Sequence, residues 1–112
     1  MKDLMPSKTF SQKVWKLAKK IPKGKVTTYK ILAQKLNTKA YRLVGQALRC
    51  NPYSPVVPCH RVVKSDGFIG GYKGIKNANS KEIKEKIKML EKEGIKIKDN
   101  RIADFDKVLF EF

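Results

Sequence analysis

The sequence has 112 residues, of which 26 are Lys or Arg and 10 are Asp or Glu, so the formal net charge is +16. A chain of this length predicts one domain over residues 1–112, and 41% hydrophobic residues are enough for a modest core and exclude global disorder. No apolar run approaches the roughly 20 residues of a membrane span, and residues 1–10 lack the apolar stretch of a signal peptide, so we expect a soluble cytoplasmic protein without membrane contacts.

The first expected helix covers residues 10–21. Apolar residues recur there at helical spacing, with Ser7 or Thr9 as the candidate N-cap and Pro22 just beyond the end. Trp15 lies beside the apolar stripe, which favours a core position over a base-stacking role.

Two further helices, separated by a three-residue break, are expected over Tyr29–Leu36 and Ala40–Cys50. The second helix has an apolar face for the core, and its opposite face carries one narrow polar stripe with a glycine on its edge. This arrangement is typical of a helix-turn-helix, which would present the stripe to DNA, although a solvated helix face gives the same pattern. The stripe and its edge consist of Arg42, Gly45, Gln46 and Arg49.

Three prolines between Asn51 and Pro58 predict a stiff extended loop, because proline fixes φ and cannot continue a helix. A turn at Ser65–Gly67 then leads to Phe68-Ile69, which suggests a small hairpin with Val62-Val63. The expected fold class is therefore mainly α with a small β-hairpin.

The last expected helix is amphipathic, with Ile83, Ile87 and Leu90 on its apolar face, Ser80 as its cap and Gly94 at its end. Its lysines are mostly assigned to a solvated face. Residues 95–98 alternate like a short strand, and apolar residues of the tail are expected to anchor the C-terminus.

The positive charge is concentrated in the first half of the chain. Asp3 is the sole acid before Asp66, whereas residues 4–65 hold eleven Lys and three Arg. A surface of one sign suits a polyanion, most simply nucleic acid. A lysine-rich surface that serves solubility or thermal adaptation is the alternative, and charge alone does not distinguish DNA from RNA.

Cys59 stands next to the one histidine, His60, in a region free of acids, where positive surroundings and an imidazole favour a nucleophilic thiolate. A small buried cysteine beside a structural histidine is the alternative from these residues alone. The other cysteine, Cys50, completes neither a Cys-x-x-Cys pair nor a four-ligand zinc set, so we expect no metal and free thiols. Cys50 has no assigned role.

The segment Pro58-Cys59-His60-Arg61-Val62 resembles the active-site signature of the O6-alkylguanine-DNA alkyltransferases, which move an alkyl group from O6 of a damaged guanine to the cysteine of that motif. The resemblance covers about residues 10–94, leaves a tail over 95–112, and implies the family's catalytic domain with a winged helix-turn-helix fold. The surrounding residues that carry it are Tyr29, Arg42, Asn51-Pro52, Gly71-Tyr72-Lys73-Gly74 and Glu93-Gly94.

The resemblance implies a nucleophile, a base and an orienting acid. Cys59 takes the alkyl group, His60 acts as base through a bridging water, and Glu93 orients the histidine. Asn51 braces the turn that brings the first two together, and Tyr29 offers its hydroxyl to guanine N3. The transfer would need no metal or organic cofactor and would consume the protein in a single turnover.

The same resemblance implies that the partner is double-stranded DNA containing O6-alkylguanine, bound by a monomer. Arg42 would enter the base stack in place of the extruded nucleotide, and Gly45 would let the helix approach the minor groove beside Gln46 and Arg49. The pocket for the flipped base would be lined by Val62, Tyr72, Lys73 and Gly74.

Some features depart from the family pattern. Tyr41 and Lys73 stand where a small residue and a serine are common, and the N-terminal ribonuclease-H-like domain of many members has no counterpart in this sequence. Short members include alkyltransferase-like proteins, which bind and flip alkylguanine without repairing it and usually have tryptophan at the nucleophile position. Cys59 favours the transferase, with the non-repairing binder as the alternative and a general basic packaging protein as a third interpretation.

Overall fold

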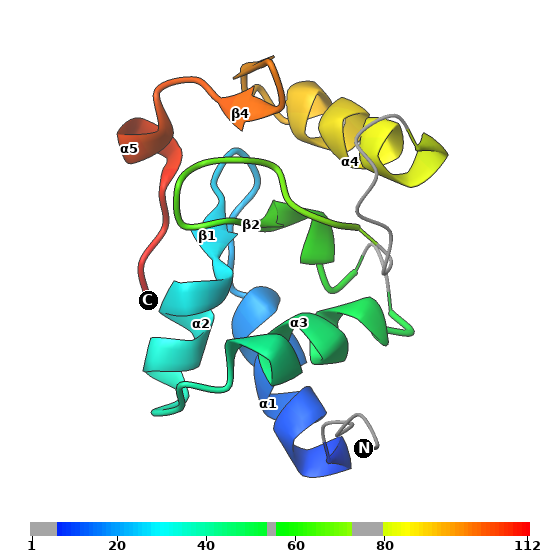
Figure 1. Ribbon diagram of the computed structural model, residues 1–112, viewed down its shortest axis with the longest axis vertical. Helices are drawn as coiled ribbons and strands as arrows, with labels where there is room; N and C mark the ends of the chain where they lie inside the picture. Colours follow the sequence, from blue (N-terminus) through cyan, green and yellow to red (C-terminus); the bar gives the residue numbers. More distant parts are fainter. Residues whose placement is uncertain (1–6, 54–55, 73–79) are drawn as a thin grey trace.

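The computed structural model describes residues 7–53, 56–72 and 80–112 (Figure 1). Lys73 and Gly74, both expected in the base pocket, lie outside these ranges. Short helices dominate the described chain, and two pairs of two-residue strands complete it. In chain order the elements are α1 (Lys8–Ala18), β1 (Thr27–Thr28), α2 (Tyr29–Lys35), α3 (Tyr41–Arg49), the 3-10 turn η1 (Cys59–Arg61), β2 (Val62–Val63), α4 (Lys81–Lys92), β3 (Ile97–Lys98), β4 (Arg101–Ile102) and α5 (Phe105–Val108).

Side-chain caps fix where α1, α2 and α4 begin. The hydroxyls of Ser7, Thr28 and Ser80 accept hydrogen bonds of 3.0, 3.0 and 3.2 Å from the backbone N–H three residues later. The helix α1 ends at Ala18, earlier than expected, but Ile21 beyond it is still buried. None of the described helices has the length and apolar character needed to cross a membrane.

The helices α2 and α3 form the predicted helix-turn-helix. The break between α2 and α3 contains Asn37 in the left-handed region, with φ of 56°, a conformation that asparagine tolerates. Both helices pack on α1, and Trp15 joins this packing through a 2.7 Å hydrogen bond from its indole N–H to the carbonyl of Ala47, as expected of a core residue. The buried core of this half consists of Val14, Ala18, Ile21, Leu32, Ala33, Val44, Ala47, Leu48, Val57 and Val62.

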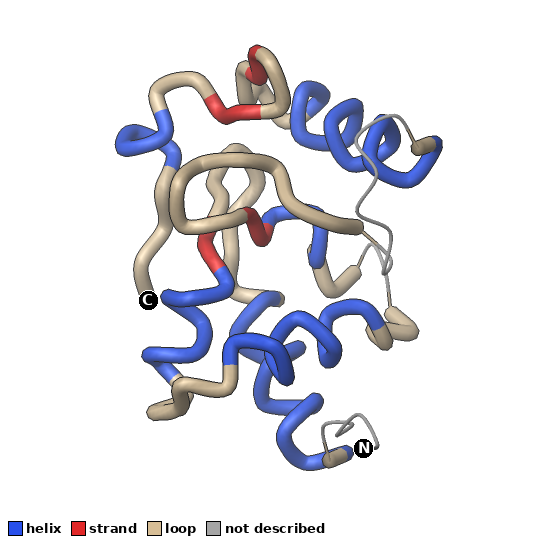
Figure 2. Tube along the Cα trace, viewed as in Figure 1, coloured by secondary structure: helices blue, strands red, loops and turns tan. Residues whose placement is uncertain are grey.

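A second core lies between α4, the strands and the loop after β2 (Figure 2). The two cores meet where β1 pairs with β2 in parallel, with Thr27 opposite Val62 and Thr28 opposite Val63. Cys59 packs against both cores. The chain therefore places this cysteine at the junction of its two halves.

The hairpin expected between Val62-Val63 and Phe68-Ile69 is wrong in its pairing. The turn between them exists, because Lys64 N–H donates to the carbonyl of Phe68 at 2.9 Å, but β2 takes β1 as its partner. Phe68 instead forms a bridge with Arg101 at the start of β4. The antiparallel hairpin of the structure is β3–β4, so the expected fold class holds while the position of its hairpin moves to the tail.

The tail completes both cores. Val26 donates to the carbonyl of Val108 at 2.9 Å and accepts from the N–H of Phe110 at 2.6 Å, so the tail runs beside the start of β1. The rings of Phe110 and Phe112 pack against the first core, and Ile102 belongs to the second. The predicted role of the apolar tail residues as anchors is confirmed.

One lysine of α4 contradicts the general expectation that the lysines of this helix are solvated. Lys86 has no exposed surface, and its ammonium donates to the carbonyls of Val62, Ile69 and Gly71 at 2.8, 2.6 and 2.9 Å. Three acceptors match the three N–H groups of a lysine. Lys86 therefore fastens the loop after β2 to α4.

Replacing Lys86 by Met should destabilise the fold by about 3 kcal/mol, because three buried carbonyls lose their hydrogen-bond donor. Met is chosen because its side chain is unbranched and similar in length to that of Lys. Urea denaturation measures the change. Lys84→Met on the exposed face of the same helix is the matched control and should stay within about 0.5 kcal/mol of the wild type. Equal stabilities of the two variants would contradict the fastening role.

Candidate active site

Cys59 opens the turn η1 and is half-buried at the edge of a cleft of ≈ 760 Å³. Its backbone N–H donates to the carbonyl of Val57 at 2.9 Å, which tightens the chain just before the turn. The same carbonyl accepts a 2.9 Å hydrogen bond from the amide of Asn51, whose Oδ1 accepts from the N–H of Tyr53. Asn51 thus braces the loop that leads into Cys59, and its predicted role in bringing Cys59 and His60 together stays a prediction.

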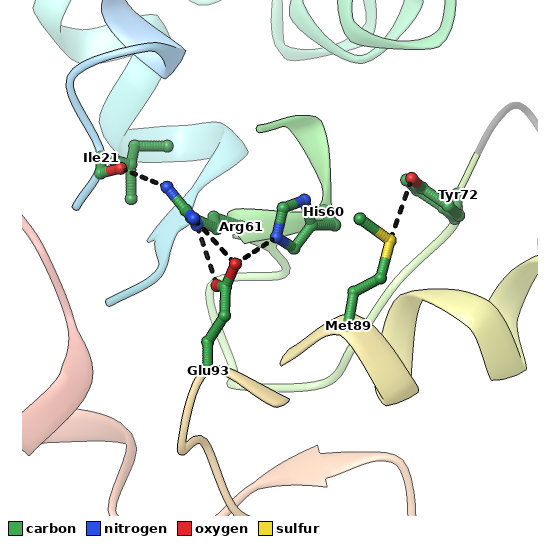
Figure 3. Close-up of polar contacts among 6 residues, drawn as sticks. All are labelled: Ile21, His60, Arg61, Tyr72, Met89 and Glu93. Atoms are coloured by element: carbon green, nitrogen blue, oxygen red, sulfur yellow. Dashed lines mark hydrogen bonds and ion pairs between the residues drawn. The ribbon is translucent and has the colours of Figure 1, made fainter. Parts of the chain in front are cut away.

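His60 follows Cys59 in η1 and is 2% exposed. Its Nε2 lies 3.0 Å from Oε2 of Glu93, the residue that caps the C-terminus of α4 (Figure 3). Because a carboxylate only accepts hydrogen bonds, Nε2 carries the proton and Nδ1 keeps its lone pair. Nδ1 is buried and has no hydrogen-bond partner within the part of the chain that the structure describes.

Arg61 is the third member of this network, and the sequence interpretation gave it no role. Its Nε and Nη2 donate to the two oxygens of Glu93 at 2.9 and 2.7 Å, and its Nη1 donates to the carbonyl of Ile21 at 2.8 Å (Figure 3). This bidentate contact fixes the plane of the carboxylate. The sequence feature that indicates a role for Arg61 is its place in the active-site signature, directly after His60.

The network sets the charges at the site. Burial alone would raise the pKa of Glu93, but the hydrogen bonds from Arg61 and His60 outweigh burial and leave this pKa below its usual value. Burial lowers the pKa of His60, against the raising effect of Glu93 and with support from the positive charges of Arg61 and Lys86. At neutral pH an ionised Glu93 therefore faces a neutral imidazole with a free acceptor at Nδ1.

Tyr29 lines the cleft together with Cys59. Burial, followed by the negative charge that Cys59 can carry, raises the pKa of Tyr29 to about 12. The phenol consequently keeps its proton at neutral pH and is available as a hydrogen-bond donor inside the cleft.

The polar stripe of α3 forms another part of the cleft lining. Arg42 and Arg49 are exposed, and Gln46 is half-buried beside them. A Cβ added to Gly45 would meet nothing within 4 Å, so the glycine leaves an open surface between these side chains. Tyr41, which departs from the family pattern, is 44% exposed on the same lining.

Tyr72 and Val62, both expected to line the base pocket, occupy different environments. Tyr72 lines the cleft and is buried, with its hydroxyl 3.6 Å from the sulfur of Met89 (Figure 3). Val62 is fully buried, and its carbonyl already accepts the ammonium of Lys86. Val62 is not among the residues that line the cleft, so the base-pocket role expected of it stays a prediction.

Lys86 also belongs to the site, because it holds the carbonyls of Ile69 and Gly71, which line the cleft. Burial lowers the pKa of Lys86 to about 7, while the nearby Cys59 acts in the raising direction. The sequence contains a feature that indicates the burial of Lys86. Position 86 lies three residues after Ile83 and four before Leu90, on the apolar stripe of α4.

No group of three or more potential metal ligands occurs in residues 7–53, 56–72 and 80–112. Cys59 and Tyr29 supply a thiol and a phenol donor at the cleft, and Cys59 is followed in η1 by a neutral imidazole that an ionised carboxylate holds. This set can deliver a sulfur nucleophile to an electrophilic carbon and return a proton to the leaving group.

The chain is similar to known proteins over most of its length. A family model for the DNA-binding domain of 6-O-methylguanine DNA methyltransferase matches residues 9–95. The methylated-DNA–protein-cysteine methyltransferase of Saccharolobus islandicus is 47% identical over 88 residues, which cover 79% of this chain and 52% of that protein. The enzyme of the same name from Methanosarcina mazei is 41% identical over 88 residues, with coverages of 78% and 52%.

Solved structures give the same result. S. pombe Atl1 in complex with damaged DNA containing O6-carboxymethylguanine matches with a TM-score of 0.80 at 28% identity, over 96% of this chain and 100% of that chain. The O6-methylguanine-DNA methyltransferase of Pyrococcus kodakaraensis matches with a TM-score of 0.64 at 46% identity, over 77% and 46% of the two chains. The chain spans about half the length of the curated relatives it matches. Its fold and its matched segment together mean that the chain belongs to the 6-O-methylguanine DNA methyltransferase family, through the DNA-binding domain of that family.

Proposed function

We propose that the protein repairs double-stranded DNA by moving an alkyl group from O6 of guanine to the sulfur of Cys59, once per molecule. The single observation that carries the proposal is the contact of His60 with Glu93 directly beside a half-buried Cys59 in a large cleft. The names and DNA complexes of the relatives support the same substrate class.

The proposed step balances as a substitution at carbon. The sulfur of Cys59 forms a bond to the alkyl carbon while the bond from that carbon to O6 breaks, and its electron pair stays with the guanine. The thiol proton passes to Nδ1 of His60, through the water that the family mechanism places between them. The guanine takes up one proton as its bond to the alkyl carbon breaks, and the imidazolium returns one proton to the solvent, so the number of protons is unchanged. A thiol and an alkylguanine thus become a thioether and guanine.

The neighbouring residues assist at both ends of this step. The ionised Glu93, fixed by Arg61, stabilises the imidazolium that forms when His60 takes the proton. The protonated phenol of Tyr29 donates to the guanine as negative charge develops there, which makes guanine a better leaving group.

DNA enters the proposal through the exposed stripe of α3 and the charge of the chain. A guanine inside a duplex does not expose O6 to an in-line attack by sulfur, so the nucleotide has to rotate out of the stack. Arg42, exposed on the cleft lining, is proposed to occupy the vacated position, with the open surface at Gly45 against the minor groove.

A second candidate function is binding of alkylated guanine without transfer. The observation that favours it is the match to S. pombe Atl1 over the full length of that chain, at the higher TM-score of 0.80. Cys59 and its network favour transfer, because a site that only binds the base has no use for a thiol beside a polarised imidazole.

A first test of the proposed function separates alkyl transfer from binding without transfer. Wild-type protein incubated with duplex DNA containing O6-methylguanine should gain the mass of one methyl group, located by peptide mass spectrometry at Cys59. Cys59→Ser should gain none while keeping its fold, because the thiol supplies the nucleophile and little packing. Cys50→Ser, at the exposed cysteine, is the control and should be alkylated normally. Wild type that binds the DNA but shows no mass gain would establish the second function.

The second prediction concerns the base. Because burial lowers the pKa of His60, the acid limb of the single-turnover transfer rate should lie below the ordinary histidine value of 6.5, where the imidazole protonates. Glu93→Gln should slow transfer at pH 7 by about 100-fold. It should also move the acid limb of the pH profile to lower pH, since Glu93 acts to raise the pKa of the histidine. An unchanged rate and an unchanged profile would remove Glu93 from the mechanism.

The third prediction concerns base extrusion. Arg42→Ala should slow transfer from duplex DNA by at least about tenfold, because an extruded nucleotide costs a few kcal/mol of lost stacking. Transfer from free O6-benzylguanine should change little, since no base has to be extruded. Lys16→Ala on the exposed side of α1 is the control for general loss of charge. Equal slowing on both substrates would mean that Arg42 supports the fold.

A further inference from the structure

The β3–β4 hairpin lies beyond residues 9–95, the segment that the family model matches, yet it borders the cleft that contains Cys59. Asn100, in the turn of the hairpin, lines this cleft together with Phe68 and Lys64 from the loop after β2. Figure 1 shows the hairpin and α3 on either side of the β1–β2 pair. The tail therefore supplies a wall of the reactive cleft that the family match does not describe.

This wall is rigidly attached to the loop. Ile69 N–H donates to the carbonyl of Asn100, and Ile102 N–H donates to the carbonyl of Gly67, both at 2.9 Å. The hairpin turn has φ of 52° at Asp99 and 60° at Asn100, the pair of left-handed residues that a tight two-residue hairpin requires. Together with the Phe68–Arg101 bridge, these hydrogen bonds join the loop to the hairpin.

Arg101 is held in place on this unit with part of its guanidinium uncommitted. Its Nε donates to the carbonyl of Asp66 at 3.2 Å, and its Cζ lies 5.5 Å from the centroid of the Phe68 ring. The carboxylate of Asp66 accepts the N–H of Phe68, and no ion pair with Arg101 occurs among the described residues. The two terminal amino groups of Arg101 donate no hydrogen bond within the same part of the chain.

Lys64 adds a second cation to the same wall. Its side chain is exposed and lines the cleft, and its Cγ would lie 3.2 Å from a Cβ on Gly70, so the aliphatic stem crosses that glycine. The ring beneath Arg101 is itself 42% exposed. An arginine that is stacked and anchored has already lost most of the rotamer entropy that binding costs, and its fork fits two oxygens of a phosphate.

We propose that Arg101 and Lys64 form a phosphate clamp, which binds an internucleotide phosphodiester of the DNA whose flipped guanine reaches Cys59. The proposal rests on the proposed function, because Lys64 lines the cleft that contains Cys59, and Arg101 directly follows Asn100, which lines the same cleft. It assigns the tail hairpin a role in gripping DNA from the side away from α3. A hairpin that only closes the fold would need neither an anchored arginine with free amino groups nor a lysine beside it.

The test is the salt dependence of binding to a duplex containing O6-methylguanine, followed by fluorescence anisotropy at several salt concentrations. Arg101→Gln and Lys64→Gln should each weaken binding by about tenfold at low salt. Because both cations are proposed to contact one phosphate, each variant should also reduce the slope of log affinity against log salt, by at most about 0.9, the value for one phosphate contact. Lys92→Gln, at an exposed lysine of α4 that does not line the cleft, is the matched control and should change the slope by much less.

Arg101→Lys separates the fork from the charge. It should keep the slope of the wild type while weakening binding, because a point charge replaces a stacked planar group. If Arg101→Gln fails to fold, Lys64→Gln, which leaves the hairpin contacts intact, decides the result. Inorganic phosphate should compete with the duplex for wild type and compete less well for Arg101→Gln. Equal competition for the two proteins would place the phosphate site elsewhere and overturn the clamp.

These experiments distinguish a failure of the clamp from a failure of the proposed function. Wild type that neither binds the duplex nor accepts an alkyl group would remove the proposed function and the clamp together. Wild type that does both, with slopes for Arg101→Gln and Lys64→Gln equal to that of Lys92→Gln, would overturn the clamp alone. Transfer from free O6-benzylguanine should be unchanged in both clamp variants, because that substrate carries no phosphate.

Discussion

The carboxylate of Glu93 is the contact on which the rest of the structure depends. It lies at the C-terminal end of α4 and receives hydrogen bonds from His60 and Arg61, which precede it by 33 and 32 residues. Arg61 extends the link to the carbonyl of Ile21, beyond the end of α1. One acid thereby joins both halves of the chain, and the imidazole that the chemistry needs is oriented by the same contact. Stability and reactivity are coupled at this point because they use the same carboxylate.

Burial is the largest influence on the charges of three groups around Cys59. It raises the pKa of Tyr29 to about 12, lowers that of His60, and lowers that of Lys86 to about 7. Tyr29 and His60 are therefore uncharged at neutral pH, while the ionised Glu93 is paired with Arg61. The proposed substitution, which passes charge from sulfur to guanine, benefits from groups that are placed in advance and need little reorganisation.

Much of the fold could be predicted from the sequence, since α1, α3 and α4 each show an apolar stripe and two of them an N-terminal Ser. The partner of β2 could not be predicted, because a two-residue strand has no periodicity and its pairing with β1 spans 35 residues. Cys59, His60 and Glu93 were found through the family resemblance, and their mutual contact is a product of tertiary structure. Lys86 was missed because a lysine among many lysines reads as solvated, although its position on the apolar stripe indicated burial.

The tail shows why a family match does not mark the limits of a domain. The matched segment ends at residue 95, but the second core includes Ile102, and the first core is covered by Phe110 and Phe112. The backbone of Val26, just before β1, is satisfied by tail residues on both its N–H and its carbonyl. Because buried backbone groups must be paired, the β1 region depends on the tail as directly as it depends on β2. The same tail places Asn100 on the lining of the reactive cleft, so the residues that finish the core also shape the surface where a substrate would approach Cys59.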